Sequence, residues 1–215
     1  ASTGLSLTRL VLDDMGAGLH STRALQSLAQ ALVLPFSDLR DVRLASNNID
    51  QREMLAFFGS LLEKTSFIER LDFSGNVVCN EVASIIASAL PNLPRLRHLD
   101  LSYHLQPYEV EKPTSCQMSC EGFSKVMSAA SVQDSLTYLN VSGHRIRNTG
   151  CLVLANLIPT IHSLKFVGLA NNRIGDRGVV PVALNLAQKK KSCQENLRLA
   201  IDLSGNPISQ KAINL

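Results

Sequence analysis

Apolar residues recur along the whole chain in one short pattern, Leu-x-x-Leu-x-Leu-x-x-Asn-x-Ile. The clearest early copy begins at Leu39 and ends at Ile49. The asparagine position of the pattern occurs at Met15, Asn47, Asn76, His104, His144, Asn172 and Asn206. The steps between these positions are 32, 29, 28, 40, 28 and 34 residues, so the base period is 28 or 29 with insertions in the longer steps. A pattern that returns in one register predicts a repeat architecture.

Each copy contains the periodicity of a strand followed by that of a helix. Apolar residues at Leu71 and Phe73 alternate with polar ones, which is typical of a strand. Further along, one helical face is formed by Val82, Ile85, Ile86, Ala89 and Leu90. Because neither element can bury its apolar face alone, the copies must stack. We predict one α/β solenoid of about seven repeats over residues 1–215, a horseshoe with parallel strands on its concave face and helices on its convex face.

The pattern also predicts which strand residues are buried and which face the solvent. The expected core contains Leu44, Leu71, Phe73, Leu99, Leu101, Leu139, Val141, Val167, Leu169, Ile201 and Leu203. The residues between them form columns across the concave face. The first column reads Arg9, Asp41, Arg70, His98, Tyr138 and Phe166. The next reads Val11, Arg43, Asp72, Asp100, Asn140, Gly168 and Asp202, and a third column of small residues follows.

Aromatic and charged residues on these columns indicate a protein-binding surface, because such residues dominate binding hot spots. The candidate site comprises Arg43, Arg70, Asp72, His98, Asp100, Tyr103, Tyr138, Asn140 and Phe166. The alternative is that the polar strand face is only solvated and that the partner binds elsewhere.

A structural role is expected for the residues at the asparagine position. A short amide there can bond to backbone groups of its own turn and of the adjacent coil. This ladder comprises Asn47, Asn76, His104, His144, Asn172 and Asn206. The two histidines are expected to replace asparagine as turn residues, and the alternative is a pH-sensitive pair on neighbouring coils.

The step of 40 residues contains an insertion of twelve. Residues 106–117 should form an irregular loop on the rim where the strands end, and loops on a rigid scaffold often carry binding residues. Tyr108 and Glu109 are its candidate contacts. Cys116 and Cys120, with His104, could be imagined as metal ligands, but their spacing is loose and no second paired motif accompanies them. We therefore predict no metal and no cofactor.

Composition narrows the function further. The net charge is only +3, which argues against nucleic acid as partner, and the run Lys189-Lys190-Lys191 is expected to be a solvated loop. No apolar stretch is long enough to span a membrane. Five cysteines, odd in number and mostly within apolar patterns, suit a reducing compartment, so we expect a cytoplasmic protein. The sequence shows no phosphate-binding glycine loop and no nucleophile elbow, and we expect no enzymatic activity.

At these repeats the chain resembles the ribonuclease-inhibitor-like subfamily of leucine-rich repeats. The resemblance covers essentially the whole chain, and the copies at 169–178 and 202–208 are typical of the subfamily. That subfamily includes ribonuclease inhibitors, repeat domains of NOD-like receptors, CARMIL-type regulators and the Ran GTPase-activating protein. The resemblance implies a scaffold that binds another protein. The alternative that it implies is regulation of a small GTPase, although no motif singles out one of Arg9, Arg40, Arg43 and Arg70 for that role.

Both ends of the repeat array lack the polar caps that close a solenoid. We therefore expect the chain to be an interior piece of a longer protein, whose flanking segments cover the terminal coils. The alternative at the first coil is that Met15 and its atypical copy act as a degenerate cap.

Overall fold

A computed structural model describes residues 7–15, 22–34, 38–62, 66–103, 117–192 and 198–213. Within this part of the chain the strands are β1 (Arg9–Val11), β2 (Asp41–Arg43), β3 (Arg70–Asp72), β4 (His98–Asp100), β5 (Tyr138–Asn140), β6 (Phe166–Gly168) and β7 (Ala200–Asp202). The helices are α1 (Thr22–Leu32), α2 (Gln51–Ser60), α3 (Asn80–Ala89), α4 (Cys120–Ser131), α5 (Arg147–Leu157), α6 (Asp176–Ser192) and α7 (Gln210–Ile213). Short 3-10 turns, η2 (Leu90–Asn92) and η4 (Ile158–Thr160), follow α3 and α5.

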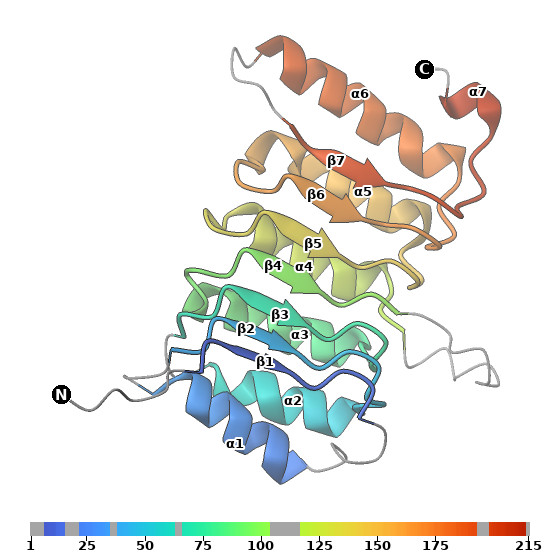
Figure 1. The fold of residues 1–215 in the computed structure, drawn as a ribbon. Helices are drawn as coiled ribbons and strands as arrows, with labels where there is room; N and C mark the ends of the chain where they lie inside the picture. The colour runs from blue at the N-terminus through green and yellow to red at the C-terminus, as the bar shows by residue number, and fades with distance from the viewer. Residues whose placement is uncertain are drawn as a thin grey trace.

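The strands form one parallel sheet in sequence order, and the helices α1 to α6 cover one of its faces (Figure 1). Neighbouring strands lie about 4.8 Å apart, whereas packed helices need about 8–10 Å. The layer of strands is therefore the shorter, inner layer, and the uncovered face of the sheet is the concave face. The structure confirms the predicted α/β solenoid with parallel strands on one side and helices on the other.

The core lies between the sheet and the helices. Nine of the eleven predicted strand positions are completely buried: Leu44, Leu71, Phe73, Leu99, Leu101, Leu139, Val141, Val167 and Leu169. Phe73 packs edge-on against Phe57 of α2, with ring centroids 4.9 Å apart. Ile201 and Leu203 were predicted to be buried as well, and this is wrong because both are only partly covered. They lie in or just after β7, the edge strand of the described sheet, where a neighbouring coil packs on one side only.

The asparagine positions join adjacent coils through buried hydrogen bonds. The Asn76 side-chain oxygen accepts from the backbone N–H groups of Asn47 and Ile49, at 3.1 and 3.0 Å. Its amide nitrogen donates to the carbonyl oxygens of Leu44 and Phe73, at 2.8 and 3.0 Å. At the same position His144 uses both ring nitrogens, one toward the Met118 N–H and one toward the Leu101 carbonyl. Comparable bonds are made by Asn47, Asn172 and Asn206. His104 lies outside the described residues.

The residue just before the asparagine position has a left-handed backbone in most coils. Its φ is positive at Asp14, Ser46, Gly75, Gly143, Asn171 and Gly205. At Gly143, where φ is 80°, a Cβ atom would lie 1.8 Å from the carbonyl oxygen of Tyr103. This turn therefore requires glycine both for its conformation and for the close approach of the adjacent coil.

Gly143→Ala is expected to lower the free energy of unfolding by at least about 2 kcal/mol, from the left-handed backbone and the forced displacement of the neighbouring coil. Chemical denaturation monitored by circular dichroism measures it. Gly59→Ala is the matched control, because a Cβ atom there meets only Ile85 Cδ1, at an ordinary 3.5 Å. Inside α2 that change should be neutral or stabilise by up to about 1 kcal/mol. Equal effects of the two substitutions would contradict this account of the turn.

The basic run was predicted to be a solvated loop, and for Lys189 this is wrong. Lys189 lies in α6 and is 8% exposed. Its ammonium group donates to the carbonyl oxygens of Ile158, at 2.7 Å, and of Ile161. These carbonyls lie at and after the end of α5, where helix geometry leaves acceptors without intrahelical partners. The charge therefore binds the end of a helix on the adjacent coil.

The first coil exposes several apolar side chains. Leu7, Val11 and Met15 are 58%, 47% and 55% exposed. The interpretation that flanking segments cover such residues stays a prediction. Among the helices of the described ranges, none has both the length and the apolar character that crossing a bilayer requires.

Candidate partner-binding face

The register of the sheet builds the first column of the concave face. Each residue pairs with its counterpart on the next strand, in the order Arg9, Asp41, Arg70, His98, Tyr138, Phe166 and Ala200. The column therefore passes from charged residues on β1 to β3 to aromatic residues on β4 to β6. Because parallel strands in register align side chains directly, one column forms a continuous strip.

The aromatic half of the column is a stack of three rings. The rings of His98 and Tyr138 are 3.9 Å apart between centroids, with an angle of 7° between their planes. Tyr138 and Phe166 follow at 4.7 Å and 9°. All three side chains are half-buried. Each ring restricts the next one, so the stack presents a rigid row of ring edges to the solvent.

The charged half of the column is organised by Asp41. Its carboxylate accepts two hydrogen bonds from Arg43, both at 3.1 Å, and one from Arg9 at 2.8 Å. The Arg70 Nε atom lies 3.9 Å away. Burial acts to raise the pKa of Asp41, but the hydrogen bond from Arg43 and the three arginine charges outweigh it and hold the pKa below its ordinary value. Asp41 thus remains ionised, and the cluster has an excess of positive charge.

A network of hydrogen bonds stiffens the second and third columns. Asp100 Oδ1 accepts from the backbone N–H and the hydroxyl of Ser102, at 2.9 and 2.6 Å. Asn140 donates to the other Asp100 oxygen at 3.0 Å and accepts from the Ser142 hydroxyl at 2.7 Å. Gly168 leaves the room for this arrangement, since a Cβ atom there would lie 2.1 Å from Asn140 Oδ1. These polar groups are preorganised before any partner arrives.

His98 lies where the two halves of the first column meet. Its pKa is lowered from the ordinary 6.5, first by burial and then by the charge of Arg70, while Asp100 and Asp72 act in the opposite direction. The folded chain therefore holds a proton on His98 less tightly than the unfolded chain does.

As the pH falls through 6.5, the unfolded state takes up the proton first, so the free energy of unfolding should decrease. We expect this decrease to be larger in the wild type than in His98→Phe, which keeps a stacked ring but cannot titrate. Urea denaturation between about pH 8 and pH 5, where histidine changes charge, measures the difference. Parallel pH profiles of the two proteins would contradict the lowered pKa.

The structure brings most of the predicted site residues together on the concave face. Those on its strands are Arg43, Arg70, Asp72, His98, Asp100, Tyr138, Asn140 and Phe166. Tyr103 was predicted to be an exposed anchor, and this is wrong because it is 3% exposed and packs beside His144. Although β4 ends at Asp100, the Tyr103 N–H still donates to the Ser142 carbonyl of the next coil at 2.8 Å. Residue 103 therefore continues the alternation of Leu99 and Leu101 and lies on the buried side. Tyr108 and Glu109, with nearly all of the expected loop 106–117, lie outside the described residues.

Asp41 and Arg9 were placed in the first column but were not counted among the candidate binding residues. The structure makes Asp41 the centre of an arginine cluster. The alternation of charge at Arg9, Asp41 and Arg70, in one register position of successive repeats, is the sequence signal that could have identified the cluster.

Two of the thiols in the described part offer little reactive chemistry. Cys79 and Cys151 are buried, and burial raises the pKa of Cys151 to about 11. Both therefore remain protonated at neutral pH and act as small apolar core residues. Within the described ranges no three histidine, cysteine or acidic side chains come together as metal ligands.

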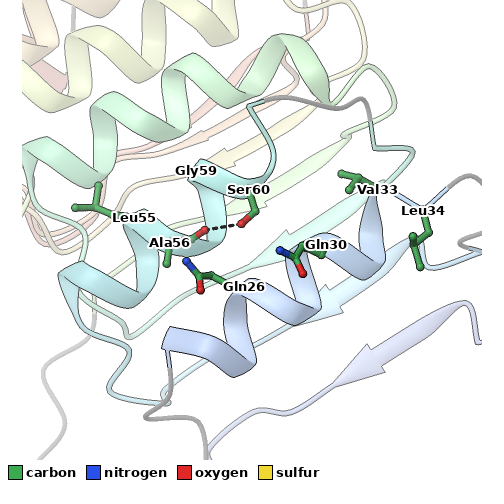
Figure 2. A pocket seen from close by; sticks show the side chains of 8 residues that line it. All are labelled: Gln26, Gln30, Val33, Leu34, Leu55, Ala56, Gly59 and Ser60. Atoms are coloured by element: carbon green, nitrogen blue, oxygen red, sulfur yellow. Dashed lines mark hydrogen bonds between the residues drawn. The ribbon is translucent and has the colours of Figure 1, made fainter.

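The helical side of the molecule has an open groove between α1 and α2 (Figure 2). Its volume is about 700 Å³, and it is lined by Gln26, Gln30, Val33, Leu34, Leu55, Ala56, Gly59 and Ser60. None of these residues is charged. The lining thus offers amides and aliphatic groups, whereas the concave face combines fixed rings with charged groups.

The repeating coils, the parallel sheet and the bonded asparagine positions define a leucine-rich repeat protein of the ribonuclease-inhibitor-like type. A family model described as "Leucine Rich repeat" matches residues 134–155 and 160–183. Over 135 residues the chain is 28% identical to RAN GTPase-activating protein 2 of Arabidopsis thaliana. The matched stretch covers 61% of this chain and 22% of that relative, so the chain corresponds to about a fifth of the relative's length.

Proposed function

We propose that this repeat domain binds another protein through its concave face. The observation that carries the proposal is the stacked row of His98, Tyr138 and Phe166, which continues directly into the arginine cluster around Asp41. Fixed aromatic side chains supply contact area at little cost in conformational entropy, and arginine provides directional hydrogen bonds. The proposed interface uses no cofactor.

The two halves of the face suggest the chemistry of the partner. The row of rings suits an apolar or aromatic anchor, which would bury the exposed ring edges. The arginines around Asp41 suit a carboxylate, because the guanidinium group binds carboxylates in a planar, two-pronged geometry. We infer a partner surface with an apolar centre and an acidic margin toward β1.

The test begins by identifying partners through affinity capture with quantitative mass spectrometry and then measures binding of a purified partner by calorimetry. Tyr138→Ala should weaken binding by roughly tenfold or more, because it removes the middle ring of the stack. Arg70→Glu and Asp100→Lys should each weaken binding through charge reversal.

The control is Arg52→Glu on α2, which makes the same charge reversal on an exposed residue of the helical side. Thermal melting must first show that every variant is folded. Unchanged affinity in all three concave-face variants would reject the concave site and favour a partner that binds elsewhere.

A second function, regulation of a small GTPase, is favoured by the similarity to RAN GTPase-activating protein 2. We propose Ran as the first GTPase to test. In a single-turnover assay, the rate of GTP hydrolysis by Ran is measured with and without a molar excess of this chain. Acceleration that depends on the concentration of the chain would support this function. An unchanged rate of hydrolysis, together with measurable binding of Ran to this chain, would support the scaffold function only.

We also propose a cytoplasmic setting. The buried, unpaired thiols of Cys79 and Cys151 are consistent with a reducing compartment. Fluorescence microscopy of the tagged full-length protein tests this location.

A further inference from the structure

Four arginines lie on the rim where strands β5 and β6 end, and we call them the rim arginines: Arg145, Arg147, Arg173 and Arg177. The Arg147 backbone N–H donates to the carbonyl oxygen of Asn172 at 2.9 Å, so Arg147 and Arg173 lie on adjacent coils side by side. Arg177 follows Arg173 by four residues, in the first turn of α6.

Three of the rim arginines have no protein partner in the described part of the chain. Arg147, Arg173 and Arg177 are exposed, and their side chains make no hydrogen bond or ion pair with a described residue. Asp176 is the acidic residue closest in sequence, but both of its oxygens accept hydrogen bonds from Ser209, each at 2.7 Å. Asp176 keeps its own charge beside Arg177, so the four rim arginines and this one carboxylate leave the rim with an excess of positive charge.

The local backbone is unfavourable for arginine at two of these positions. Arg147 has a φ of 57° and Arg173 a φ of 59°. This left-handed region is tolerated by glycine and, among other residues, mainly by asparagine and aspartate, whose short side chains bond locally. Neither arginine gains such a bond. Strained backbone of this kind concentrates at functional sites.

The helix ends are unfavourable for these charges as well. Arg147 is the first residue of α5 and Arg177 the second residue of α6, at the positive ends of their helix dipoles. In contrast, the first turns of α2, α3 and α4 contain Glu53, Glu81 and Glu121. The first turn of α5 contains no acidic residue, and in that of α6 the charge of Asp176 is offset by Arg177. Arginine is thus energetically unfavourable at several neighbouring positions and makes no compensating contact within the fold. This pattern indicates that these side chains bind another molecule.

We propose that the rim arginines bind an acidic segment of a protein partner. Guanidinium groups recognise carboxylates through paired hydrogen bonds, and the helix ends add attraction for negative charge. A protein segment fits better than nucleic acid, because the basic patch spans only two coils, whereas nucleic acid is usually bound along a longer basic stripe. The rim is separate from the aromatic stack, so this inference goes beyond the proposed function and can fail independently of it.

The test uses a fluorescein-labelled peptide of ten glutamates and fluorescence anisotropy at low ionic strength. In the double variant Arg147→Asn with Arg173→Asn, the affinity should fall by about tenfold, because two charged donors are lost. The melting temperature of the same variant should exceed that of the wild type by roughly one degree or more, because asparagine adopts the left-handed backbone at a lower energetic cost than arginine. Arginines with a merely structural role would give the opposite shift of the melting temperature.

The matched control is the double variant Arg23→Gln with Arg52→Gln. These residues are exposed second residues of α1 and α2, so the same net charge is removed from first turns on other coils. Its affinity for the peptide should change by less than about twofold, because those charges are distant and screened. Tyr138→Ala should also leave peptide binding unchanged, which separates this surface from the concave face.

Two results would overturn the proposal. The first is an equal loss of affinity in the control and in the rim variant, which would show that only net charge matters. The second is tighter binding of a single-stranded oligodeoxythymidine of ten nucleotides than of the glutamate peptide, lost in the rim variant, which would assign the rim to nucleic acid.

Discussion

Asn76→Ala is expected to lower the free energy of unfolding by about 3–6 kcal/mol, because each buried polar group left without a partner costs about 1–3 kcal/mol. The substitution removes the side-chain partner of the Asn47 and Ile49 N–H groups and of the Leu44 carbonyl at once. The Phe73 carbonyl also loses a bond but still accepts from the Asn76 backbone N–H. The site is completely buried, so water cannot easily replace the lost amide. Since the bonds join two coils, the effect should spread to both.

Chemical denaturation gives the free energy, and hydrogen exchange should show reduced protection of Asn47 and Ile49. Asn156→Ala, on the exposed side of α5, is the control and should change the stability by less than about 0.5 kcal/mol. Asn76→His is informative too, because His144 fills the same position in another coil and bonds on both sides. If Asn76→Ala lowered the free energy of unfolding no more than the control does, the hydrogen bonds of the ladder would not stabilise the fold.

Phe73→Ala is expected to lower the free energy of unfolding by about 3–5 kcal/mol, through lost apolar burial and the cavity that remains. Phe73 is completely buried between β3 and the helices, and its ring lies 4.9 Å from that of Phe57 and 5.3 Å from that of Phe58. These neighbours come from the preceding coil, so the cavity would open where two coils join.

The same denaturation experiment measures this loss, with Val132→Ala as the control. Val132 is 74% exposed, and its truncation should be close to neutral. Phe73→Leu should recover a large part of the stability because it refills most of the volume. A loss below about 1 kcal/mol for Phe73→Ala would mean that the coils collapse into the space and that the core tolerates large changes.

Much of this architecture could be predicted from the sequence. The spacing of apolar residues defines which side chains must be buried, and a parallel sheet built from equal repeats has only one register that buries all of them. The positions of Leu99 and Leu139 therefore placed His98 beside Tyr138, even though 40 residues separate the two rings. The asparagine position followed from the same logic, because a turn between buried strands needs a partner for its backbone groups.

The contacts made by these side chains were decided only by the tertiary structure. The shared column predicts that Arg9, Asp41 and Arg70 are neighbours. Whether both arginines form ion pairs with Asp41 depends on their rotamers and on burial. Lys189 was assigned to a solvated loop because its acceptors, near Ile158, belong to another coil about thirty residues away.

Tyr103 and Arg147 show the same limit at single positions. Tyr103 lies on the buried side with Leu99 and Leu101, but its neighbour, the ring of His144 on the next coil, is set by the packing of the coils. Arg147 begins a helix, and its left-handed φ arises where the chain meets the carbonyl of Asn172 on the next coil. Sequence periodicity determines which face a residue occupies, because each repeat must bury the same side. The partner of that residue is set by the packing of coils whose turns and insertions differ, and this information is not local in the chain.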